Sequence, residues 1–332
     1  MNSLENIFKD KDILITGGLG FIGSNAAKKL LDLGARVCVV DALIPDEGGN
    51  MFNVDEIKER IQIHIADIRD KEKTGELVKG RDYIFNLAGQ VSHIDSMNDP
   101  LMDMEINCRS QLILLEACRK KNPKVRIAFA STRQVYGKPL RLPVDEGHPI
   151  LPCDVNGINK MAGEWYHSLY AKVYGLKTVS LRLTNAYGPH LLMKHSRQGF
   201  IGWFIRQAID AEDIQVYGDG KQVRDFNYVD DVVNALLLAV SAEDSWGKAF
   251  NLGGSEHINL LELAKLIIQT AGTGSCRLVP FPAEKKKIDI GDYCGDFSRF
   301  RSVSGWEPRV SLKEGLAKTI EFYRKYKKFY WS

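Results

Sequence analysis

The sequence predicts an α/β protein with a doubly wound parallel sheet and a smaller, mixed α/β lobe in the C-terminal part of the chain. In the first half, short apolar runs alternate with longer segments of helical periodicity, which is the pattern of parallel β-α-β units. A glycine-rich segment at residues 17–23 follows the first apolar run and precedes a helical segment. Such sheets bind ligands outside the carboxyl ends of their strands, so this segment is the first candidate site.

The elements of the first half are predicted in chain order. Helical periodicity indicates helices at residues 21–33, 102–120 and 157–174, and in the second of these Ile106 and Ile113 share one face. The remaining short apolar runs predict buried strands at residues 13–16, 36–40, 61–66, 83–87, 125–130 and 178–183.

The alternation weakens from about residue 184, and no repeat or low-complexity linker separates the two halves. We expect residues 1–183 to form one domain to which residues 228–254 return, while residues 184–227 and 255–332 form the second lobe. Within the second half, a strand is predicted at residues 250–252 and helices at residues 197–211, 229–240, 260–271 and 312–326.

Composition narrows the class of protein. Of 332 residues, 44% are apolar and 26% charged, and the net charge of +3 comes from interspersed residues of both signs. These values are ordinary for a soluble domain and give no support for a nucleic-acid or membrane partner. The basic run at residues 285–287 is expected to be a solvated loop. The polar N-terminus and the lack of an apolar run of about 18 residues favour a cytoplasmic protein.

The six cysteines are scattered and form no C-x-x-C pair, which argues against a metal site. Cys38 falls in a predicted strand, and Cys108 and Cys118 fall in a predicted helix. We expect these three to be reduced and buried.

The glycine-rich segment has the chemistry of a dinucleotide site. Glycines allow a tight turn and a close approach of backbone N–H groups to a pyrophosphate at the start of a helix. Asp41 ends the next predicted strand, where its carboxylate would accept hydrogen bonds from ribose hydroxyls and repel a 2′-phosphate. The sequence therefore predicts a Rossmann domain that binds NAD rather than NADP. The segment reads Thr16-Gly17-Gly18-Leu19-Gly20-Phe21-Ile22-Gly23.

Further motifs run nearly from end to end of the chain. They are Asp67-Ile68, Asn86-Leu87-Ala88-Gly89, Asn107, Ser131-Thr132-Arg133-Gln134-Val135-Tyr136-Gly137, Leu181-Arg182-Leu183-Thr184-Asn185-Ala186-Tyr187-Gly188-Pro189, Gly218-Asp219-Gly220 with Arg224-Asp225-Phe226, and Asp292. Together with the glycine loop, they resemble the extended short-chain dehydrogenase/reductases, specifically the nucleotide-sugar epimerase/dehydratase group.

The resemblance implies a nucleoside-diphosphate sugar as partner and a role for each motif. Asp67 and Ile68 would contact the adenine, Leu87, Ala88 and Gly89 would follow the cofactor, and Thr132 would be the catalytic Ser/Thr. Asn185 and Arg224 would bind the sugar diphosphate, and Asp292 the nucleotide ribose. The helices at residues 101–120 and 157–174 correspond to those that pair in homodimers of this family.

Several of these positions have a second interpretation. Asn86 and Asn107 are also explained as partners of buried backbone groups. Asn185 is also explained as a turn residue, and Arg224 as the partner of a neighbouring aspartate. His93 either lines the sugar pocket or has a structural role.

The family's Y-x-x-x-K signature is incomplete here. Its tyrosine is the acid/base, and its lysine lowers the pKa of that tyrosine and holds the nicotinamide ribose. The segment Asp154-Val155-Asn156-Gly157-Ile158-Asn159-Lys160 keeps the lysine but has Asn156 at the tyrosine position. An amide does not titrate usefully, so Asn156 cannot take the proton of the sugar hydroxyl.

Three explanations of Asn156 remain open. Another group acts as the base: Lys160, His93, Cys153, Asp154, Tyr187 or a water relay. The chain has instead lost its oxidoreductase activity and kept nucleotide-sugar binding. The third explanation is an engineered change that traps substrate, although Asn159 also departs from the usual Ser/Thr.

The residues after Thr132 narrow the reaction. The 4,6-dehydratases of the family have an Asp-Glu pair where this chain has Arg133 and Gln134, and the decarboxylases have a glutamate at Gln134. Both reactions are therefore disfavoured. We expect epimerisation at a sugar carbinol, C4 above all, or simple dehydrogenation, with Gln134 and His93 contacting the sugar. Asp289 stands where the family usually has an arginine, so a UDP-glucose pocket is not carried over unchanged.

Overall fold

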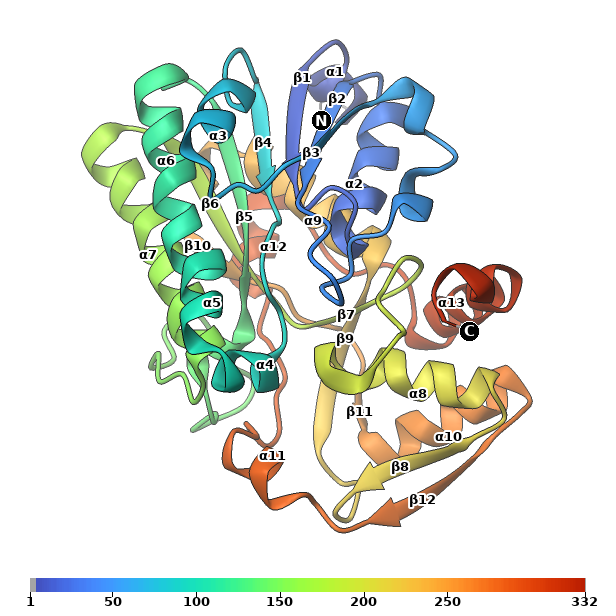
Figure 1. The fold of residues 1–332 in the computed structure, drawn as a ribbon. Coiled ribbons are helices and arrows are strands. Elements are labelled where there is room, and N and C mark those ends of the chain that lie inside the picture. Colours follow the sequence, from blue (N-terminus) through green and yellow to red (C-terminus); the bar gives the residue numbers. More distant parts are fainter. Residues whose placement is uncertain (1–3, 332) are drawn as a thin grey trace.

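Seven parallel strands form the central sheet of the structure, a computed structural model that describes residues 4–331 (Figure 1). The strand order is β10-β6-β5-β4-β1-β2-β3, so the direction of winding reverses between β1 and β4. Every neighbouring pair is parallel. The strands are β1 (Asp12–Thr16), β2 (Arg36–Asp41), β3 (Gln62–Ile65), β4 (Tyr83–Asn86), β5 (Arg126–Thr132), β6 (Lys177–Leu183) and β10 (Ala249–Asn251).

Helices cover both faces of this sheet because successive strand side chains point in opposite directions. Ile13 and Ile15 of β1 belong to one buried cluster, while Leu14 between them belongs to another. The first face carries α1 (Leu4–Phe8), α2 (Phe21–Asp32) and α9 (Val229–Ser241), and the second carries α3 (Lys71–Leu77), α6 (Ser110–Lys121) and α7 (Val155–Tyr174). The predicted doubly wound parallel sheet is confirmed.

The helix predicted at residues 102–120 is divided, which corrects the sequence-based assignment. Its first part begins earlier, as α5 (Pro100–Met104), because Asp99 accepts a hydrogen bond from the Met102 N–H and Pro100 fits the first turn. A π-helical turn, Glu105–Arg109, then separates α5 from α6. Such turns are frequent at functional sites, and this one carries Asn107. The short helix α4 (His93–Asn98) precedes α5.

The second lobe is a mixed α/β structure, as predicted, but most of its strands escape prediction from the sequence. A three-stranded sheet has the order β11-β9-β7, with one antiparallel and one parallel pair, and β8 and β12 form a separate parallel pair. The strands are β7 (Asn185–Tyr187), β8 (Asp213–Tyr217), β9 (Val223–Tyr228), β11 (His257–Asn259) and β12 (Ser275–Val279). The helices are α8 (Phe200–Ile209), α10 (Leu260–Ala271), α11 (Ala283–Lys287), α12 (Ser298–Ser304) and α13 (Leu312–Tyr326).

The two lobes share one hydrophobic core. Ile13 of the large sheet, Ile214 of β8 and Leu316 of α13 all belong to the same buried cluster. Strand β10 and helix α9, both within residues 228–254, lie in or on the large sheet. The domain boundary at residue 183 stays a prediction.

Two smaller expectations need correction. The basic run at residues 285–287 is not a loop but the end of the short helix α11. All six cysteines are free, and Cys38 and Cys118 are buried, but Cys108 is only partly buried because it lies on the π-helical turn at the edge of α6.

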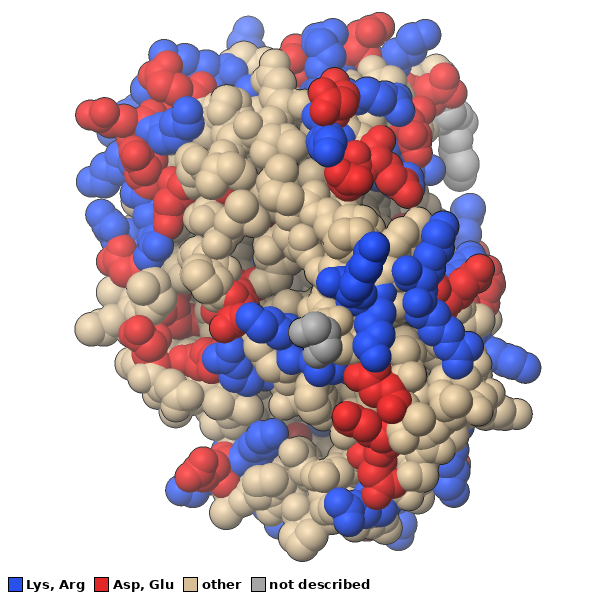
Figure 2. Space-filling model, turned by 45° about the vertical axis from the view of Figure 1, so that its right-hand side comes forward, with Lys and Arg blue, Asp and Glu red and all other residues tan. Residues whose placement is uncertain are grey.

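The surface shows charges of both signs. On the face drawn in Figure 2, basic and acidic side chains are interspersed among uncharged ones. No helix within residues 4–331 is both long and apolar enough to span a membrane. Over the same residues, no three His, Cys, Asp or Glu side chains are grouped in a way that could hold a metal ion.

Candidate active site

The glycine loop joins β1 to α2 in a geometry that requires glycine. Gly17 has φ +66°, and a Cβ there would lie 2.9 Å from the Ala88 backbone. A Cβ at Gly23 would collide with the Gly17 carbonyl. No side chain caps the N-terminus of α2, so its first backbone N–H groups are available to an anionic ligand. This arrangement fits the pyrophosphate of a dinucleotide.

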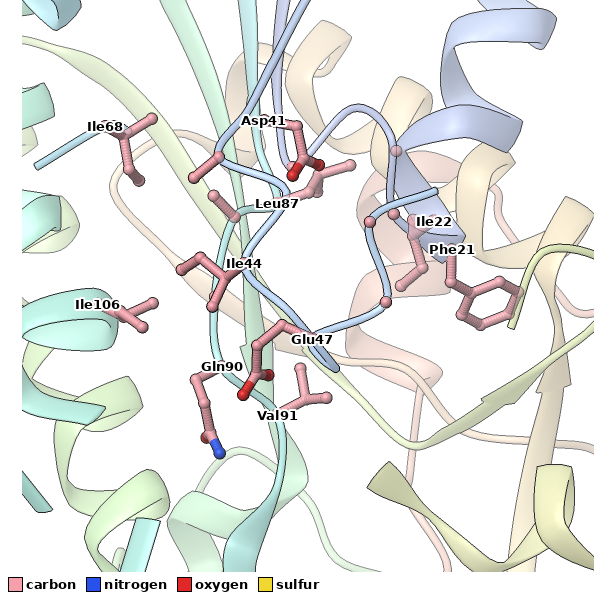
Figure 3. Close-up of a pocket in the computed structure, with 18 of the residues that line it drawn as sticks. Phe21, Ile22, Asp41, Ile44, Glu47, Ile68, Leu87, Gln90, Val91 and Ile106 are labelled. Atoms are coloured by element: carbon pink, nitrogen blue, oxygen red, sulfur yellow. The ribbon is translucent and has the colours of Figure 1, made fainter. Parts of the chain in front are cut away.

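Asp41 lies at the end of β2 with its carboxylate toward the same loop. It accepts hydrogen bonds from the Leu19 N–H (3.1 Å) and the Leu43 N–H (2.9 Å), which fix its orientation. Burial raises the pKa of Asp41. The remaining lone pairs of the carboxylate face the cavity shown in Figure 3, where ribose hydroxyls would donate to them.

One cavity brings together nearly all the residues that the sequence indicated for the cofactor. The exception is Lys160. The lining includes Gly17, Gly20, Phe21, Ile22, Gly23, Asp41, Asp67, Ile68, Leu87, Ala88 and Gly89. Their roles stay predictions, but their convergence fits NAD in extent and chemistry. Other lining residues were not indicated by the sequence, among them Ile44, Glu47, Gln90, Leu191 and Gln198.

Two residues of the predicted cofactor motifs, Asp67 and Asn86, have internal partners, and only Asp67 lines the cavity. Burial opposes ionisation of Asp67, but hydrogen bonds from Arg69 outweigh it and lower the pKa of Asp67. Asn86 accepts from the Thr16 hydroxyl (2.9 Å) and donates to Gln111 (2.6 Å), so its side chain ties β1 to β4. Both partners are side chains, whereas the structural interpretation of Asn86 expected buried backbone groups.

Thr132 and Lys160 lie near the end of β5. The Thr132 hydroxyl oxygen accepts from the Gln134 N–H (3.1 Å), which leaves its proton available for donation. Lys160, on α7, is buried, and its Nζ donates to the Ala130 carbonyl (3.3 Å). A Cβ at Gly89 would lie 2.6 Å from this Nζ, so the amine meets the end of the cofactor cavity. Burial lowers the pKa of Lys160 to about 8, although the Asp103 charge opposes the shift.

Asn156 is buried in a polar cluster around Asp103, which sequence reasoning missed. Its Nδ2 donates to the Gln90 carbonyl (2.8 Å) and to Asp103 Oδ2 (3.1 Å). Asp103 also accepts from Asn107 (3.0 Å) and Asn159 (2.7 Å). Because a carboxylate only accepts, Asp103 sets the orientation of all three amides. The spacing of Asp103 and Asn107, four residues apart on a helix face, was the available signal.

The sugar-side residues His93 and Gln134 converge on Asp154. His93 Nδ1 lies 3.0 Å from Asp154 Oδ2, and Gln134 Nε2 donates to the same oxygen (2.7 Å). The other carboxylate oxygen caps α7 through the Gly157 N–H (2.7 Å). Burial opposes ionisation of Asp154, but His93 and these hydrogen bonds outweigh it and lower its pKa. The Asp154 carboxylate is therefore ionised and hydrogen-bonded, and it orients the side chains of His93 and Gln134.

Two of the alternative bases are placed unfavourably. Burial, and next the Asp154 charge, raise the pKa of Cys153 to about 11. Tyr187 is fully buried, its hydroxyl donates to the Leu312 carbonyl (3.3 Å), and burial raises its pKa. Neither group can serve readily as a base near neutral pH.

The residues expected to bind the diphosphate lie where the lobes meet. Asn185 accepts from Arg133 (2.9 Å) and donates to the Asp225 carbonyl (2.9 Å). Arg224 is buried and lies 3.4 Å from Asp289, so an aspartate other than its sequence neighbour is its partner. The sequence analysis considered Arg133 only as the residue that replaces a carboxylate of the dehydratases. It did not predict the contact of Arg133 with Asn185.

Asp292 lies in the loop after α11, beside the start of β9, the strand that carries Arg224. Its Oδ1 accepts from the Val223 N–H (2.8 Å), and Arg224 donates to the Val223 carbonyl (2.9 Å). The structure thus brings Asp292, Arg224 and Asn185 together around β9, while the ribose contact of Asp292 stays a prediction.

The fold, the uncapped helix start and the acidic strand end define a dinucleotide-binding protein of the Rossmann class. Residues 13–253 match the model of the NAD dependent epimerase/dehydratase family. The chain belongs to this family, and the predicted cofactor, NAD, is confirmed.

Individual relatives are similar to this chain over almost its whole length. It is 33% identical over 315 residues to the UDP-glucose 4-epimerase of Mycolicibacterium smegmatis, covering 94% of this chain and 98% of the relative. The UDP-glucose 4-epimerase of Thermotoga maritima, solved with UDP-glucose, superposes with a TM-score of 0.87 at 33% identity, covering 95% and 99% of the two chains.

Similarity does not separate the reactions within the family. The UDP-glucuronic acid decarboxylase 1 of Xenopus tropicalis is 32% identical over 320 residues, covering 95% of this chain and 72% of the relative. Arg133 and Gln134 predict that decarboxylation and 4,6-dehydration are disfavoured, and this stays a prediction.

Proposed function

We propose that this chain is a nucleotide-sugar epimerase that acts at a sugar carbinol, C4, with a non-standard acid/base. The observation that supports it most is the single cavity that collects the cofactor residues and ends at Lys160. The similarity to UDP-glucose 4-epimerases supports C4 as the position. The amide of Gln134, held by Asp154, supplies no carboxyl group for dehydration or decarboxylation.

Thr132 and Lys160 have different roles in the proposed reaction. The chemistry that bound NAD supplies is reversible hydride exchange with the sugar carbon. Thr132 donates its free proton to the reacting hydroxyl oxygen and so orients the carbinol. Lys160, as the neutral amine, takes the hydroxyl proton and returns it from the ammonium form. A pKa of about 8 makes both forms accessible near neutral pH.

Asn156 contributes without titrating. Its Nδ2 is committed to Gln90 and Asp103, so its Oδ1 points away from them and accepts no hydrogen bond from the described residues. Under the proposal, this oxygen accepts a hydrogen bond from a sugar hydroxyl or from an ordered water. Because this buried position holds an amide that does not titrate, Asn156 also favours a second candidate function. This is a protein that binds NAD and a nucleotide sugar without turnover.

The test is incubation of the purified protein with NAD⁺ and a panel of UDP-, dTDP-, CDP- and GDP-sugars, followed by NMR of the products. An epimer supports the proposal, whereas cofactor reduction with a ketosugar and no epimer indicates a dehydrogenase. If no product forms and the cofactor stays oxidised across the panel, the binding protein is the better explanation.

Asn156→Tyr separates the same alternatives. Under the proposal it lowers an existing activity, because the phenol disrupts the contacts with Gln90 and Asp103. Activity that arises only in Asn156→Tyr would show that the natural chain has lost its acid/base.

We also infer a homodimer. Helix α7 exposes Ile158, Trp165, Leu169 and Val173, which follow one another at helical spacing, and between 47% and 57% of each side chain is exposed. Leu101 on the adjacent α5 is 70% exposed. An apolar face of this kind is typical of a surface covered by a partner, and it coincides with the helices indicated by the family resemblance.

A further inference from the structure

Three buried polar groups without partners lie at the junction of the lobes. Arg133 Nη1, Arg224 Nε and the Tyr293 hydroxyl are buried, and none forms a hydrogen bond within residues 4–331. Guanidinium nitrogens can only donate, and a phenol can donate as well. Buried donors are nearly always paired, so unpaired donors gathered at one place indicate an acceptor-rich ligand.

Contacts between separate segments bring these groups together. The Arg133 guanidinium lies over the Tyr293 ring, 5.1 Å from Cζ to the ring centroid. Its Nη2 is held by Asn185 at the start of β7 (2.9 Å). The Tyr293 N–H donates to the Val223 carbonyl (3.0 Å), so Tyr293 lies beside the strand segment that carries Arg224. Burial, and next the Arg133 charge, lower the pKa of Arg224 to about 10.

The Arg133 charge lacks a counter-ion. Asp289 is within ion-pair distance of Arg224, but no carboxylate of the described residues is within that distance of Arg133. The nearby Asp225 is occupied by the Thr184 hydroxyl and by two backbone N–H groups, at Gly254 and Gly295. Burial lowers the pKa of Arg133, but a guanidinium stays protonated at neutral pH. A buried guanidinium charge without an ion-pair partner is stabilised by an anion that arrives with the ligand.

We propose that Arg133, with Tyr293 and Arg224, binds an anionic group of the nucleotide sugar. This inference rests on the proposed function. Arg133 follows Thr132, the predicted contact of the reacting carbinol, and it holds Asn185, the predicted contact of the diphosphate. The group between them is either a carboxylate on the sugar or the β-phosphate, and both present oxygens that a planar guanidinium fork matches. In the second case, Arg133 supplies, from the turn that follows β5, the cation that is absent at Asp289.

The test uses the full chain in the presence of NAD and isothermal titration calorimetry. UDP, dTDP, CDP and GDP are titrated first, and the tightest binder is then compared with its glucose and glucuronate derivatives. Arg133→Gln should weaken binding of the recognised ligands about 10- to 100-fold. Arg133→Lys, which keeps the charge without the fork, should recover part of the loss. Arg141→Gln, at an exposed arginine, is the matched control.

The ligands distinguish the two sources of the anion. A loss confined to the glucuronate derivative assigns Arg133 to a sugar carboxylate, and an equal loss for all three ligands assigns it to the phosphate. Unchanged affinity for every ligand overturns the inference while the proposed function stands. If no nucleotide binds the native chain, the proposed function fails and this inference with it.

A second variant covers the case in which Arg133→Gln does not fold. Tyr293→Phe removes only the unpaired hydroxyl and should weaken the same ligands by about three- to tenfold. If Arg133→Gln does not fold, equal binding of every ligand by Tyr293→Phe and the native chain would overturn the inference.

Discussion

The side-chain amide of Asn156 donates a hydrogen bond to the Asp103 carboxylate across 3.1 Å, inside a cluster that is almost fully buried. The residue at the family's tyrosine position is therefore part of a polar network and does not merely fill a gap. Asn159, the second departure from the family signature, donates to the other oxygen of Asp103 at 2.7 Å. The two departures have one structural explanation, which argues against a single engineered change at Asn156.

The first prediction concerns this carboxylate. Asp103→Leu leaves the amides of Asn156, Asn159 and Asn107 without their common acceptor, and each buried unpaired donor costs about 1–3 kcal/mol. Because Asn156 and Asn107 keep the Gln90 carbonyl, we expect a loss of about 3 kcal/mol in the free energy of unfolding, measured by urea denaturation.

The matched control for Asp103→Leu is Asp55→Leu, which replaces an exposed aspartate paired with Lys58. It should change the free energy of unfolding by less than about 1 kcal/mol. Equal stability of the two variants would show that the Asp103 cluster does not hold the amides in place.

The sequence was sufficient for those parts of the site that depend on local spacing. Gly17, Gly20 and Gly23 lie in one short loop, and Asp41 ends the following strand. Hydrophobic periodicity and the glycine spacing were therefore enough to predict that these residues lie close together. Asp103 was not predictable in this way. It meets Asn156 across 53 residues of sequence, and a lone aspartate on a helix is usually exposed.

The second lobe illustrates the same limit. Strand β8 alternates correctly, with Ile214 and Val216 buried and Gln215 exposed, but five residues are too few to separate a strand from a loop. Its partner β12 pairs from 62 residues away, at Ser275 opposite Asp213. Helices α10 and α13 were predicted with their observed bounds because their periodicity extends over three or more turns.

The second prediction tests Lys160 as the acid/base. Because its pKa is lowered to about 8, the neutral amine becomes available as pH rises, so kcat/KM should increase through about pH 8 and then level off. Lys160→Met should lower kcat/KM at least about 100-fold. Steady-state rates of epimer formation between pH 6 and about 9.5 provide the measurement.

Lys160→Arg is the control for charge. Arginine keeps the positive charge near Gly89 but does not lose its proton in this range, so activity should be lost while NAD binding is retained. An active Lys160→Arg enzyme with a flat pH profile would assign Lys160 to binding and leave the base to another group.

The third prediction concerns the apolar face of α7. Leu169→Asp places a charge in the middle of the exposed row that includes Trp165 and Val173. If this row is buried between two subunits, the variant should be a monomer by sedimentation, with the native chain a dimer. Lys172→Asp, at an exposed position of the same helix, should leave the mass unchanged. A monomeric native chain would contradict the inferred homodimer.

The fourth prediction concerns Glu47, whose carboxyl group extends toward Gln90 and Val91 in the cofactor cavity (Figure 3). Burial, and next the Asp95 charge, raise its pKa from 4.5 to about 7, although Arg197 opposes the shift. The unfolded chain ionises near pH 4.5 while the folded chain resists until about 7, so stability is lost as pH rises across this window.

Glu47→Gln removes this loss. At pH 8 and fixed NAD concentration, the variant should be more stable than the native chain by about 1–2 kcal/mol, after allowance for solvent screening. Below about pH 4.5 the two should unfold alike, because Glu47 is then protonated in both states. Glu59→Gln, at an exposed glutamate, should show no such pH-dependent difference. A stability difference for Glu47→Gln that is the same at both pH values would mean that packing, rather than the ionisation of Glu47, causes it.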